Sequence, residues 1–487
     1  MTRISSTDAN SAVRTAIVPL LFCVLCLAGC AVGPNFTPPD TPVPGGWVGP
    51  TVSPEPQPGA AEVDLAKWWT VFNDPKLTSL VQDAFSSNLD LRIATARIRQ
   101  ARASRKIAVS GIGPTLDGSG SFHRSQASSG GSDTESATVG NYQTGFDASW
   151  EIDIFGGVRR GIEAANAEVQ AAVENRRDVL VTLAAEVARN YVELRTYQQR
   201  IAIARKNLQA QQHSADLTRE KFEAGFVSGL DVANADAQVA TTEAQVPLLE
   251  SSARQAIYAL GVLTDREPGA LVQDFSDRAE IPAAPPPVPV GVPSDLLRRR
   301  PDIRRAEAEI HAATAQIGAA TADLFPKVSI GGAIGWQAAD TGSFFDPLTR
   351  FWSLGPSVTW NLFRTGRTLS NIELQRALEE QSLLAYRQTV LTAIQEVENA
   401  LIASAKEQEH RRSIQAAVAA NRKAAELATD LYIGLQTDFL NVLSAQRSLY
   451  SSEDSLAQST GAMAVELIAL YKALGGGWEE RPQAPGE

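Results

Sequence analysis

The feature that most constrains the fold is a short alternating segment followed by a very long helical one. Residues 142–152 alternate apolar and polar side chains, which is typical of a strand with one apolar and one wet face. From Gly157 the chain is rich in Ala, Glu, Arg and Gln and contains no proline before Pro247. A helix of about 65 residues would be about 100 Å long, whereas an ordinary helix has about 11–12 residues.

The same unit occurs a second time, which indicates an internal duplication. The interval from Trp360 to Tyr432 equals the interval from Trp150 to Phe222. Further matching landmarks are Asp90-Leu91-Arg92 with Asp302-Ile303-Arg304, Pro114 with Pro326, and Leu230-Asp231-Val232 with Leu440-Asn441-Val442. The offset between matching residues of the two copies changes by two in the loop that joins the paired strands, where a change in length costs little free energy.

The patterns predict a definite order of segments along the chain. A signal peptide is expected at residues 1–29 and a lipidated, extended leash at 30–66. The first repeat, 67–280, is expected to hold short helices, strands at about 114–125 and 141–153, and helices at about 157–223 and 229–261. A Pro-rich linker and a short helix follow at 281–300. The second repeat, 301–475, is expected to hold strands at about 327–338 and 351–363 and helices at about 367–433 and 438–474, before a tail at 476–487.

The N-terminus has the pattern of an export signal. Arg3 and Arg14 precede an apolar run that ends in Leu27-Ala28-Gly29-Cys30. Small residues directly before a cysteine resemble the lipobox of bacterial lipoproteins, which implies cleavage before Cys30 and a covalent lipid on its sulfur. An ordinary cysteine at the end of a signal is the alternative. By resemblance to lipoprotein sorting patterns, Val32 in place of an aspartate favours the outer membrane of a Gram-negative bacterium.

Composition and motifs argue against nucleic-acid binding and against catalysis. The formal net charge is −11, so the arginine run at 298–300 is expected on a solvated helix face or in ion pairs between helices. The chain after the signal lacks HExxH, GxSxG, P-loop and CxxC motifs. The histidines are scattered and are expected to be solvated surface residues: His123, His213, His311 and His410. We therefore expect that the protein is not an enzyme and that it binds no cofactor. The covalent lipid on Cys30 is the one attached group that we expect.

Four half-apolar strands of about ten residues fit a membrane β-barrel, in which strands tilt near 45°. Aromatic residues near the strand ends are expected at the membrane interface: Trp150, Phe155, Trp336, Phe351, Trp352, Trp360 and Phe363. A water-soluble sandwich is the alternative, but it leaves the long helices unexplained. Open sheet edges are not tolerated in lipid and eight strands are the usual minimum, so the chain must oligomerise, and three copies would give a twelve-stranded barrel. Two long hairpins per copy would then form a hollow helical cylinder.

Several motifs together resemble the TolC-like outer-membrane factors, in the lipoprotein branch of OprM and NodT-type proteins. They are Cys30-Ala31-Val32-Gly33-Pro34-Asn35-Phe36, Trp68-Trp69, Asp74-Pro75-Lys76-Leu77, Pro301-Asp302-Ile303, Thr437 to Leu443, and Tyr471 to Trp478. The resemblance implies a homotrimeric channel-tunnel, a β-barrel in outer-membrane lipid above a long periplasmic α-helical barrel. It implies the exit duct of a tripartite efflux pump for drugs or other small molecules, with a periplasmic adaptor and an inner-membrane transporter, commonly of the RND class. An ABC or major-facilitator partner, or a structural trimeric surface lipoprotein, are the alternatives.

The resemblance also suggests where the duct docks and closes. The turns expected to face the adaptor are Gly225, Phe226, Val227, Ser228 and Gly229, and Gly434, Leu435, Gln436 and Thr437. By motif position, the periplasmic gate falls on Leu440, Ser444 and Arg447. The family commonly has an aspartate where this chain has Ser444, which puts the usual acidic ring in doubt. Asp438 could replace that acid or could cap the helix, and Leu440 could face the lumen or the helix packing.

Overall fold

The computed structural model describes residues 31–49, 64–126, 138–283 and 291–478. The predicted signal peptide, Cys30, residues 50–63 of the leash, residues 284–290 of the linker and residues 479–487 of the tail lie outside these ranges. Contacts divide the chain into two units, which are treated separately below. Unit 1 comprises Met1–Asp40, Ile98–Ala172 and Arg305–Tyr386, and unit 2 comprises Thr41–Arg97, Val173–Arg304 and Arg387–Glu487.

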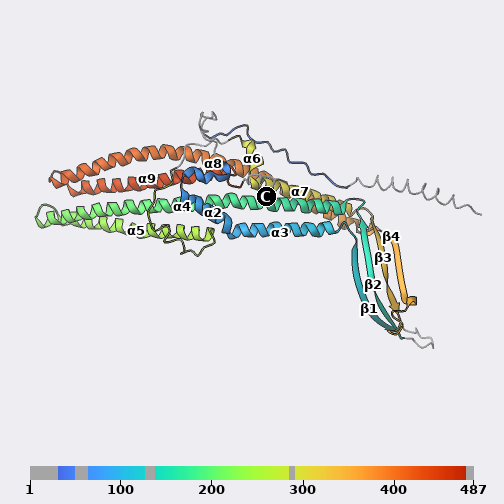
Figure 1. The fold of residues 1–487 in the computed structure, drawn as a ribbon. Coiled ribbons are helices and arrows are strands. Elements are labelled where there is room, and N and C mark those ends of the chain that lie inside the picture. Colours follow the sequence, from blue (N-terminus) through green and yellow to red (C-terminus); the bar gives the residue numbers. More distant parts are fainter. Residues whose placement is uncertain (1–30, 50–63, 127–137, 284–290, 479–487) are drawn as a thin grey trace, which may run out of the picture. The chain divides into compact units, whose positions relative to one another are not determined.

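The same order of helices and strands occurs twice along the chain (Figure 1). The first copy contains η1 Leu65–Phe72, α2 Pro75–Ser87, α3 Leu89–Ser110, β1 Thr115–Gln126, β2 Thr138–Ile152, α4 Gly157–Glu223 and α5 Gly229–Leu263. The second contains α6 Pro293–Arg299, α7 Pro301–Ala322, β3 Lys327–Ala338, η2 Pro347–Thr349, β4 Arg350–Thr359, η3 Leu362–Arg364, α8 Thr365–Ile433 and α9 Phe439–Ala473. The helices α4 with α5, and α8 with α9, run side by side as two long hairpins (Figure 1).

The predicted long helices agree closely with the observed ones, but the last strand was predicted too long. The prediction continued this strand to Phe363, whereas β4 ends at Thr359 and residues 362–364 form a 3₁₀ turn. Thr359 pairs with Lys327, the first residue of β3. β4 ends at Thr359 because β3 offers no further residue to pair with. The apolar–polar alternation of the sequence continues beyond that point.

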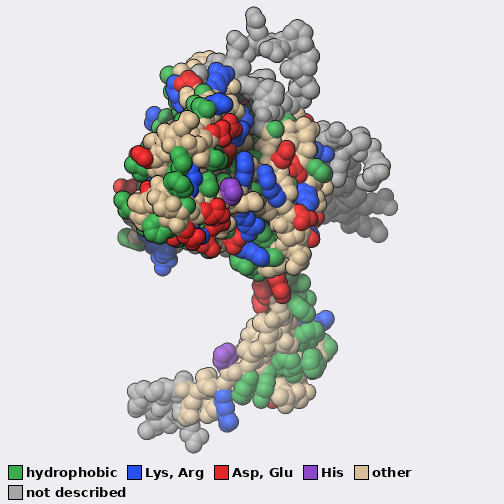
Figure 2. Space-filling view, turned by 90° about the vertical axis from the view of Figure 1, so that its left-hand side faces the viewer, with side chains coloured by type: hydrophobic (Ala, Val, Ile, Leu, Met, Phe, Trp, Pro, Cys, Tyr) green, Lys and Arg blue, Asp and Glu red, His purple; other side chains and the backbone are tan. Residues whose placement is uncertain are grey.

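The four strands form one antiparallel sheet in the order β1-β2-β3-β4, and its two faces differ. Residues that pair across strands lie on the same face. One row places Phe146 opposite Ile334, which in turn lies opposite Trp352; the adjacent row on the other face contains Asp147, Ala333 and Ser353. Figure 2 shows hydrophobic side chains gathered along the sheet. The apolar face is left uncovered, since Ile334 is 60% and Trp352 78% exposed.

In unit 2, the family motifs from both ends of the chain meet in one core. Trp68 is fully buried and stacks on Tyr471 with ring centroids 5.2 Å apart. Tyr191 of α4 donates its hydroxyl to Asp74 at 2.6 Å, and Asp74 also caps α2 by accepting from two backbone N–H groups. Burial, and then the hydrogen bond to Asp74, raise the pKa of Tyr191 to about 12. These contacts fix the N-terminal segment of unit 2 against α4 and the end of α9.

In unit 2, Arg300 of the arginine run and the nearby Arg304 make ion pairs, which was one of the two expectations for this region. Arg300 is 7% exposed and contacts Asp302 and Glu396, each at 2.7 Å. Arg304 pairs at 2.8 Å with the buried Glu174. Across the described ranges, no helix has a stretch long and apolar enough to cross a membrane.

Candidate functional site: the hairpin tips

The two hairpin tips in unit 2 have the same backbone turn, in which the second residue after the helix adopts a left-handed conformation. In the first tip this residue is Gly225, with φ 79°, and Phe226 N–H donates to Lys221 O at 2.9 Å. In the second tip it is Leu435, with φ 57°, and Gln436 N–H donates to Leu431 O at 2.8 Å. This is the Schellman arrangement that ends many helices, usually with glycine. Leucine at this position is strained, because its Cβ crowds the following carbonyl.

This difference predicts that reciprocal substitutions at the two tips change the stability of the last helical turn in opposite directions. Leu435→Gly should stabilise the last turn of α8 by about 1 kcal/mol, whereas Gly225→Leu should destabilise the last turn of α4 by about 1–2 kcal/mol. Hydrogen exchange of peptides that cover each tip measures both effects. Changes of the same sign at both tips would contradict the interpretation.

The two tips are joined to each other by Lys221 of α4. Its ammonium group lies 4.3 Å from the centroid of the Tyr432 ring and donates to the carbonyl oxygens of Tyr432 and Ile433 at the end of α8. A positive charge at a helix C-terminus is favourable. Tyr432 in turn donates its hydroxyl to Thr218 at 3.1 Å. The buried residues at this junction are Ala215, Ala235, Tyr432, Phe439, Val442 and Leu443.

The predicted turn residues lie at the ends of the hairpins, and several apolar ones are exposed. Phe226 is 65% exposed and Leu435 57%. Val227 packs against the buried junction, so it contributes to holding the tips rather than to the free surface. Ser228 is the N-cap of α5, and its N–H and hydroxyl both donate to Asp231, at 3.0 and 2.8 Å. Thr437 accepts from Asn441 at 2.8 Å at the start of α9.

The predicted gate residues Leu440, Ser444 and Arg447 lie on the exposed side of α9. Leu440 is 63% exposed, and Ser444 is also exposed. The packing against the neighbouring helices is made by other residues of α9, namely Phe439, Val442 and Leu443. Within one chain, Leu440 therefore does not face the helix packing, which had been the alternative to a lumen position.

Arg447 ties α9 to α5 and so joins the two hairpins. Its Nε donates to Oε1 of Gln238, whose side chain is buried. One turn further along, Tyr450 donates its hydroxyl to Gln245, again on α5. We call these two contacts, Arg447–Gln238 and Tyr450–Gln245, the latch. A buried amide oxygen that loses its donor is costly, so the latch stabilises one arrangement of the hairpins.

Asp438 occupies the N-cap position of α9, but its side chain makes no capping hydrogen bond. Of the two alternatives for Asp438, the side-chain cap is therefore not formed in this structure. The first turn is closed instead by the backbone, where Asn441 N–H donates to Asp438 O at 3.1 Å. The exposed carboxylate is left available as a charge at the tip.

Most of the predicted interface aromatics lie on the apolar face of the sheet or at its ends. Trp150 and Trp360, at matching positions of the two copies, donate their indole N–H groups to Ile112 O and Leu324 O, at 2.7 and 3.1 Å. Phe363 is fully exposed, whereas Phe155 stacks on Phe325. Trp336 and Trp352 share the apolar face, but Phe351 lies on the opposite face, against Gly335. Successive residues of a strand point to opposite faces, so Phe351 and Trp352 lie on opposite faces of the sheet. Both had been expected at the membrane interface.

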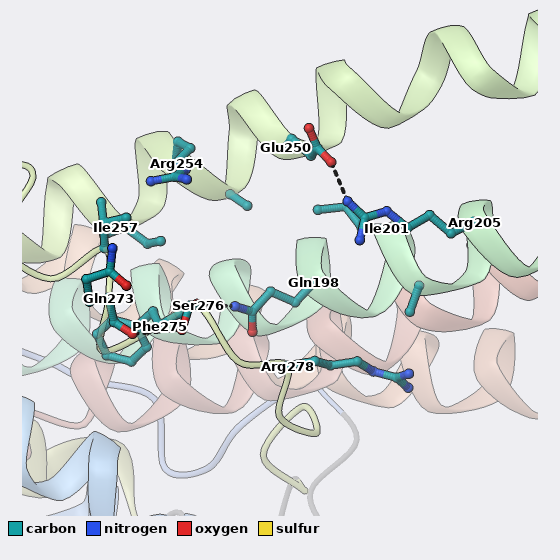
Figure 3. Close-up of a pocket in the computed structure, with 13 residues that line it drawn as sticks. Gln198, Ile201, Arg205, Glu250, Arg254, Ile257, Gln273, Phe275, Ser276 and Arg278 are labelled. Atoms are coloured by element: carbon teal, nitrogen blue, oxygen red, sulfur yellow. Dashed lines mark hydrogen bonds and ion pairs between the residues drawn. The ribbon is translucent and has the colours of Figure 1, made fainter.

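A groove between α4, α5 and the segment after α5 has a volume of about 450 Å³ (Figure 3). Its polar lining includes three arginines, and one of them, Arg205, pairs with Glu250 at 2.6 Å. The groove lacks a nucleophile beside a base and lacks a pair of carboxylates. Nor do the described residues contain a cluster of histidine, cysteine and carboxylate side chains that could hold a metal ion.

Sequence reasoning missed a set of contacts in unit 1. His311 had been expected to be a solvated surface residue, but it stacks on Phe36 and lies 3.0 Å from Glu163. Glu163 also pairs at 2.8 Å with Arg160, which is 4% exposed. The leash thus begins with a docked segment. The Gly33 and Asn35 motif residues were visible in the sequence, but their partners more than a hundred residues away were not.

Comparison with known proteins places the chain in a family. The pattern of the family described as "Outer membrane efflux protein" matches residues 80–264 and 292–476. Nodulation protein T of Rhizobium leguminosarum bv. trifolii is 34% identical over 458 residues, which cover 94% of this chain and 96% of the relative. The pyoverdine export outer membrane protein OpmQ of Pseudomonas aeruginosa is 32% identical over 431 residues, with coverages of 86% and 89%. The solved structure of the outer-membrane channel OprN superimposes with a TM-score of 0.85 at 36% identity, covering 92% of this chain and all of that one. The chain therefore belongs to the outer membrane efflux proteins, the TolC-like channel-tunnel family that its motifs resemble.

Proposed function

We propose that three copies of this chain form the outer-membrane exit duct of a tripartite efflux pump. The observation that carries the proposal is the four-stranded sheet, which has an exposed apolar face and ends in β1 on one side and β4 on the other. Lipid offers no hydrogen-bond partners, so these edges must pair with strands of other copies. Three copies close a barrel of twelve strands, within the known range of membrane barrels.

The adaptor would dock at the hairpin tips. The exposed apolar side chains there include Phe226, Leu230, Leu435 and Leu440, and a cluster of exposed apolar residues is typical of a protein–protein contact. The contact through Lys221 holds the two tips as one surface. The inner-membrane transporter is proposed to be of the RND class, with an ABC or major-facilitator transporter as the alternative.

The gate would lie just behind the tips, at Leu440, Ser444, Arg447 and Asp438. In the trimer, Leu440 would form an apolar ring. Asp438 would supply the acidic charge that Ser444 cannot, since its carboxylate is not engaged in capping. Adaptor binding would open the gate by replacing the latch contacts of each copy.

Cys30 is proposed to carry the lipid that anchors the duct in the outer membrane. The support is the sequence Leu27-Ala28-Gly29-Cys30 at the end of an apolar run. The protein would transport its cargo without chemistry, and the lipid would be its sole attached group. A structural surface lipoprotein is disfavoured, because it would not need long hairpins that end in exposed apolar tips.

The proposal is tested by deleting the gene in its native host and measuring the retention of fluorescent dyes and drugs. We expect increased retention, restored by the full chain in the outer-membrane fraction. A proton uncoupler should stop the export at once if the transporter is proton-driven, as an RND or major-facilitator transporter would be, whereas export that lasts until ATP is depleted would favour the ABC alternative. Unchanged retention, together with no conductance of the purified protein in planar bilayers, would refute the duct.

A further inference from the structure

In unit 1, the first described residues of the chain are held against the junction of β2 and α4. Val32 N–H donates to Phe155 O at 3.0 Å, which extends the hydrogen bonding beyond the end of β2. Gly156, with φ 81°, lies so close to Ala31 that a Cβ on it would meet the Ala31 Cα at 2.7 Å. A side chain at position 156 would therefore displace the segment.

The side chain of Arg160 binds this segment from α4. Its Nε donates to Val32 O at 3.2 Å, and its Nη2 donates to Asn35 Oδ1 at 2.7 Å. The remaining nitrogen, Nη1, pairs with Glu163 at 2.8 Å. Arg160 is 4% exposed, so these bonds form away from water, where charge-assisted hydrogen bonds are strongest.

A second contact comes from α7. The ring of His311 stacks on Phe36 with centroids 4.4 Å apart and an interplanar angle of 11°, while its Nε2 lies 3.0 Å from Glu163. Glu163 thus joins Arg160 and His311. Burial alone would raise the pKa of Glu163, but the hydrogen bonds and charges of Arg160 and His311 outweigh it and hold this pKa below the usual value. The carboxylate is therefore ionised at neutral pH.

The duplication shows that this arrangement is specific to one half of the chain. In the second copy, the position that matches Arg160 is Ser370. The first-copy positions that match His311 and Gly318 are Arg99 and Lys106. Gly318 matters because Gly33 packs on it, and a Cβ on Gly33 would meet the Gly318 Cα at 2.5 Å. The chain has one N-terminal segment, and only one half has the residues that hold it.

We propose that Arg160, Glu163 and His311 form a socket for residues 31–36, and that the socket fixes the level at which the lipid on Cys30 enters the membrane. The inference rests on the proposed lipidation of Cys30. Consecutive Cα atoms are about 3.8 Å apart, and the socket fixes Ala31, the residue that follows the proposed lipid site, at the β2–α4 junction. Trp150 and Trp360 lie at this end of the sheet, and exposed tryptophans mark the boundary between lipid and water. The acyl chains would therefore start at the level of the aromatic belt.

The test is hydrogen exchange of peptides from residues 31–40 in the full-length purified protein. Arg160→Ala should speed exchange at Val32 roughly tenfold to a hundredfold, since it removes charge-assisted bonds. Asn35→Ala changes only the bound segment, so it leaves α4 intact and should give a smaller increase in the same peptides. Arg367→Ala, in the first turn of α8, is the matched control and should leave their exchange unchanged.

A Cys30→Ser variant, exported with a signal peptide whose cleavage does not require the cysteine, separates the socket from the lipid. If the socket holds the segment, this variant loses the acyl mass and keeps slow exchange at residues 31–36. Fast exchange in Cys30→Ser with Arg160 intact, or slow exchange in Arg160→Ala, would overturn the socket. An unmodified Cys30 in the wild-type protein would refute the proposed lipidation and with it the membrane level, whereas the exchange results would still decide the socket.

Discussion

Ile334→Lys is expected to abolish the outer-membrane oligomer. Ile334 lies in the middle of β3 on the apolar face, between Phe146 and Trp352, and is 60% exposed within one chain. A lysine on the lipid face of a barrel costs about 2–4 kcal/mol at the bilayer midplane. Three copies carry this cost three times, so assembly should fail. The readout is the heat-stable oligomer on gels of the outer-membrane fraction.

The neighbouring residue supplies a matched control on the opposite face. Ala333 pairs with Asp147 of β2, which also accepts a hydrogen bond from Ser119 at 3.1 Å. Ala333→Lys would place its ammonium group beside that carboxylate in the water-filled lumen. We expect normal assembly for Ala333→Lys, and equal behaviour of the two variants would show that the faces are assigned wrongly.

Arg447→Ala is expected to open the periplasmic end of the channel. The substitution removes the donor to the buried Gln238 and with it the main contact of the latch between α9 and α5. Loss of a hydrogen bond from a charged group costs about 1.5–3 kcal/mol, which shifts the open-to-closed ratio about tenfold or more per copy. Single-channel conductance in planar bilayers and uptake of bulky antibiotics should both rise.

Two further variants identify the latch as the cause. Gln238→Ala removes the other partner, and the double variant should open the channel little more than either single one. Arg219→Ala is the control, because Arg219 pairs with Asp216 and Asp236 within the first hairpin. If Arg447→Ala raised neither conductance nor uptake, the gate assignment would fail.

Periodic features were predictable from the sequence because local spacing determines them. The helix expected at 157–223 has those bounds, since its apolar stripe and lack of proline allow a long helix and the glycines at 156 and 225 mark its ends. The end of β4 was not predictable from its own residues, because it depends on where β3 begins. Likewise, the face of Phe351 follows from its pairing with Gly335, not from its being aromatic.

The positions of the turns at the hairpin tips were predictable from the sequence, but the contacts of these tips were not. The tip turns carry glycines that mark chain reversal, and the resemblance placed the gate one turn later. Neither signal indicates that Arg447 binds Gln238, or that Lys221 joins the two tips, because these partners lie more than two hundred residues apart. The socket around Arg160 was missed for the same reason: long-range pairs leave no periodic pattern.

The most direct test of the duct is the mass and the negative-stain image of the full mature protein purified in detergent. The 67-residue helix α4 alone would span about 100 Å. A particle with threefold symmetry, a tube at least that long and a mass near three chains would agree with the account. A compact monomer would contradict the barrel closure, and with it the proposal that the chain forms a channel.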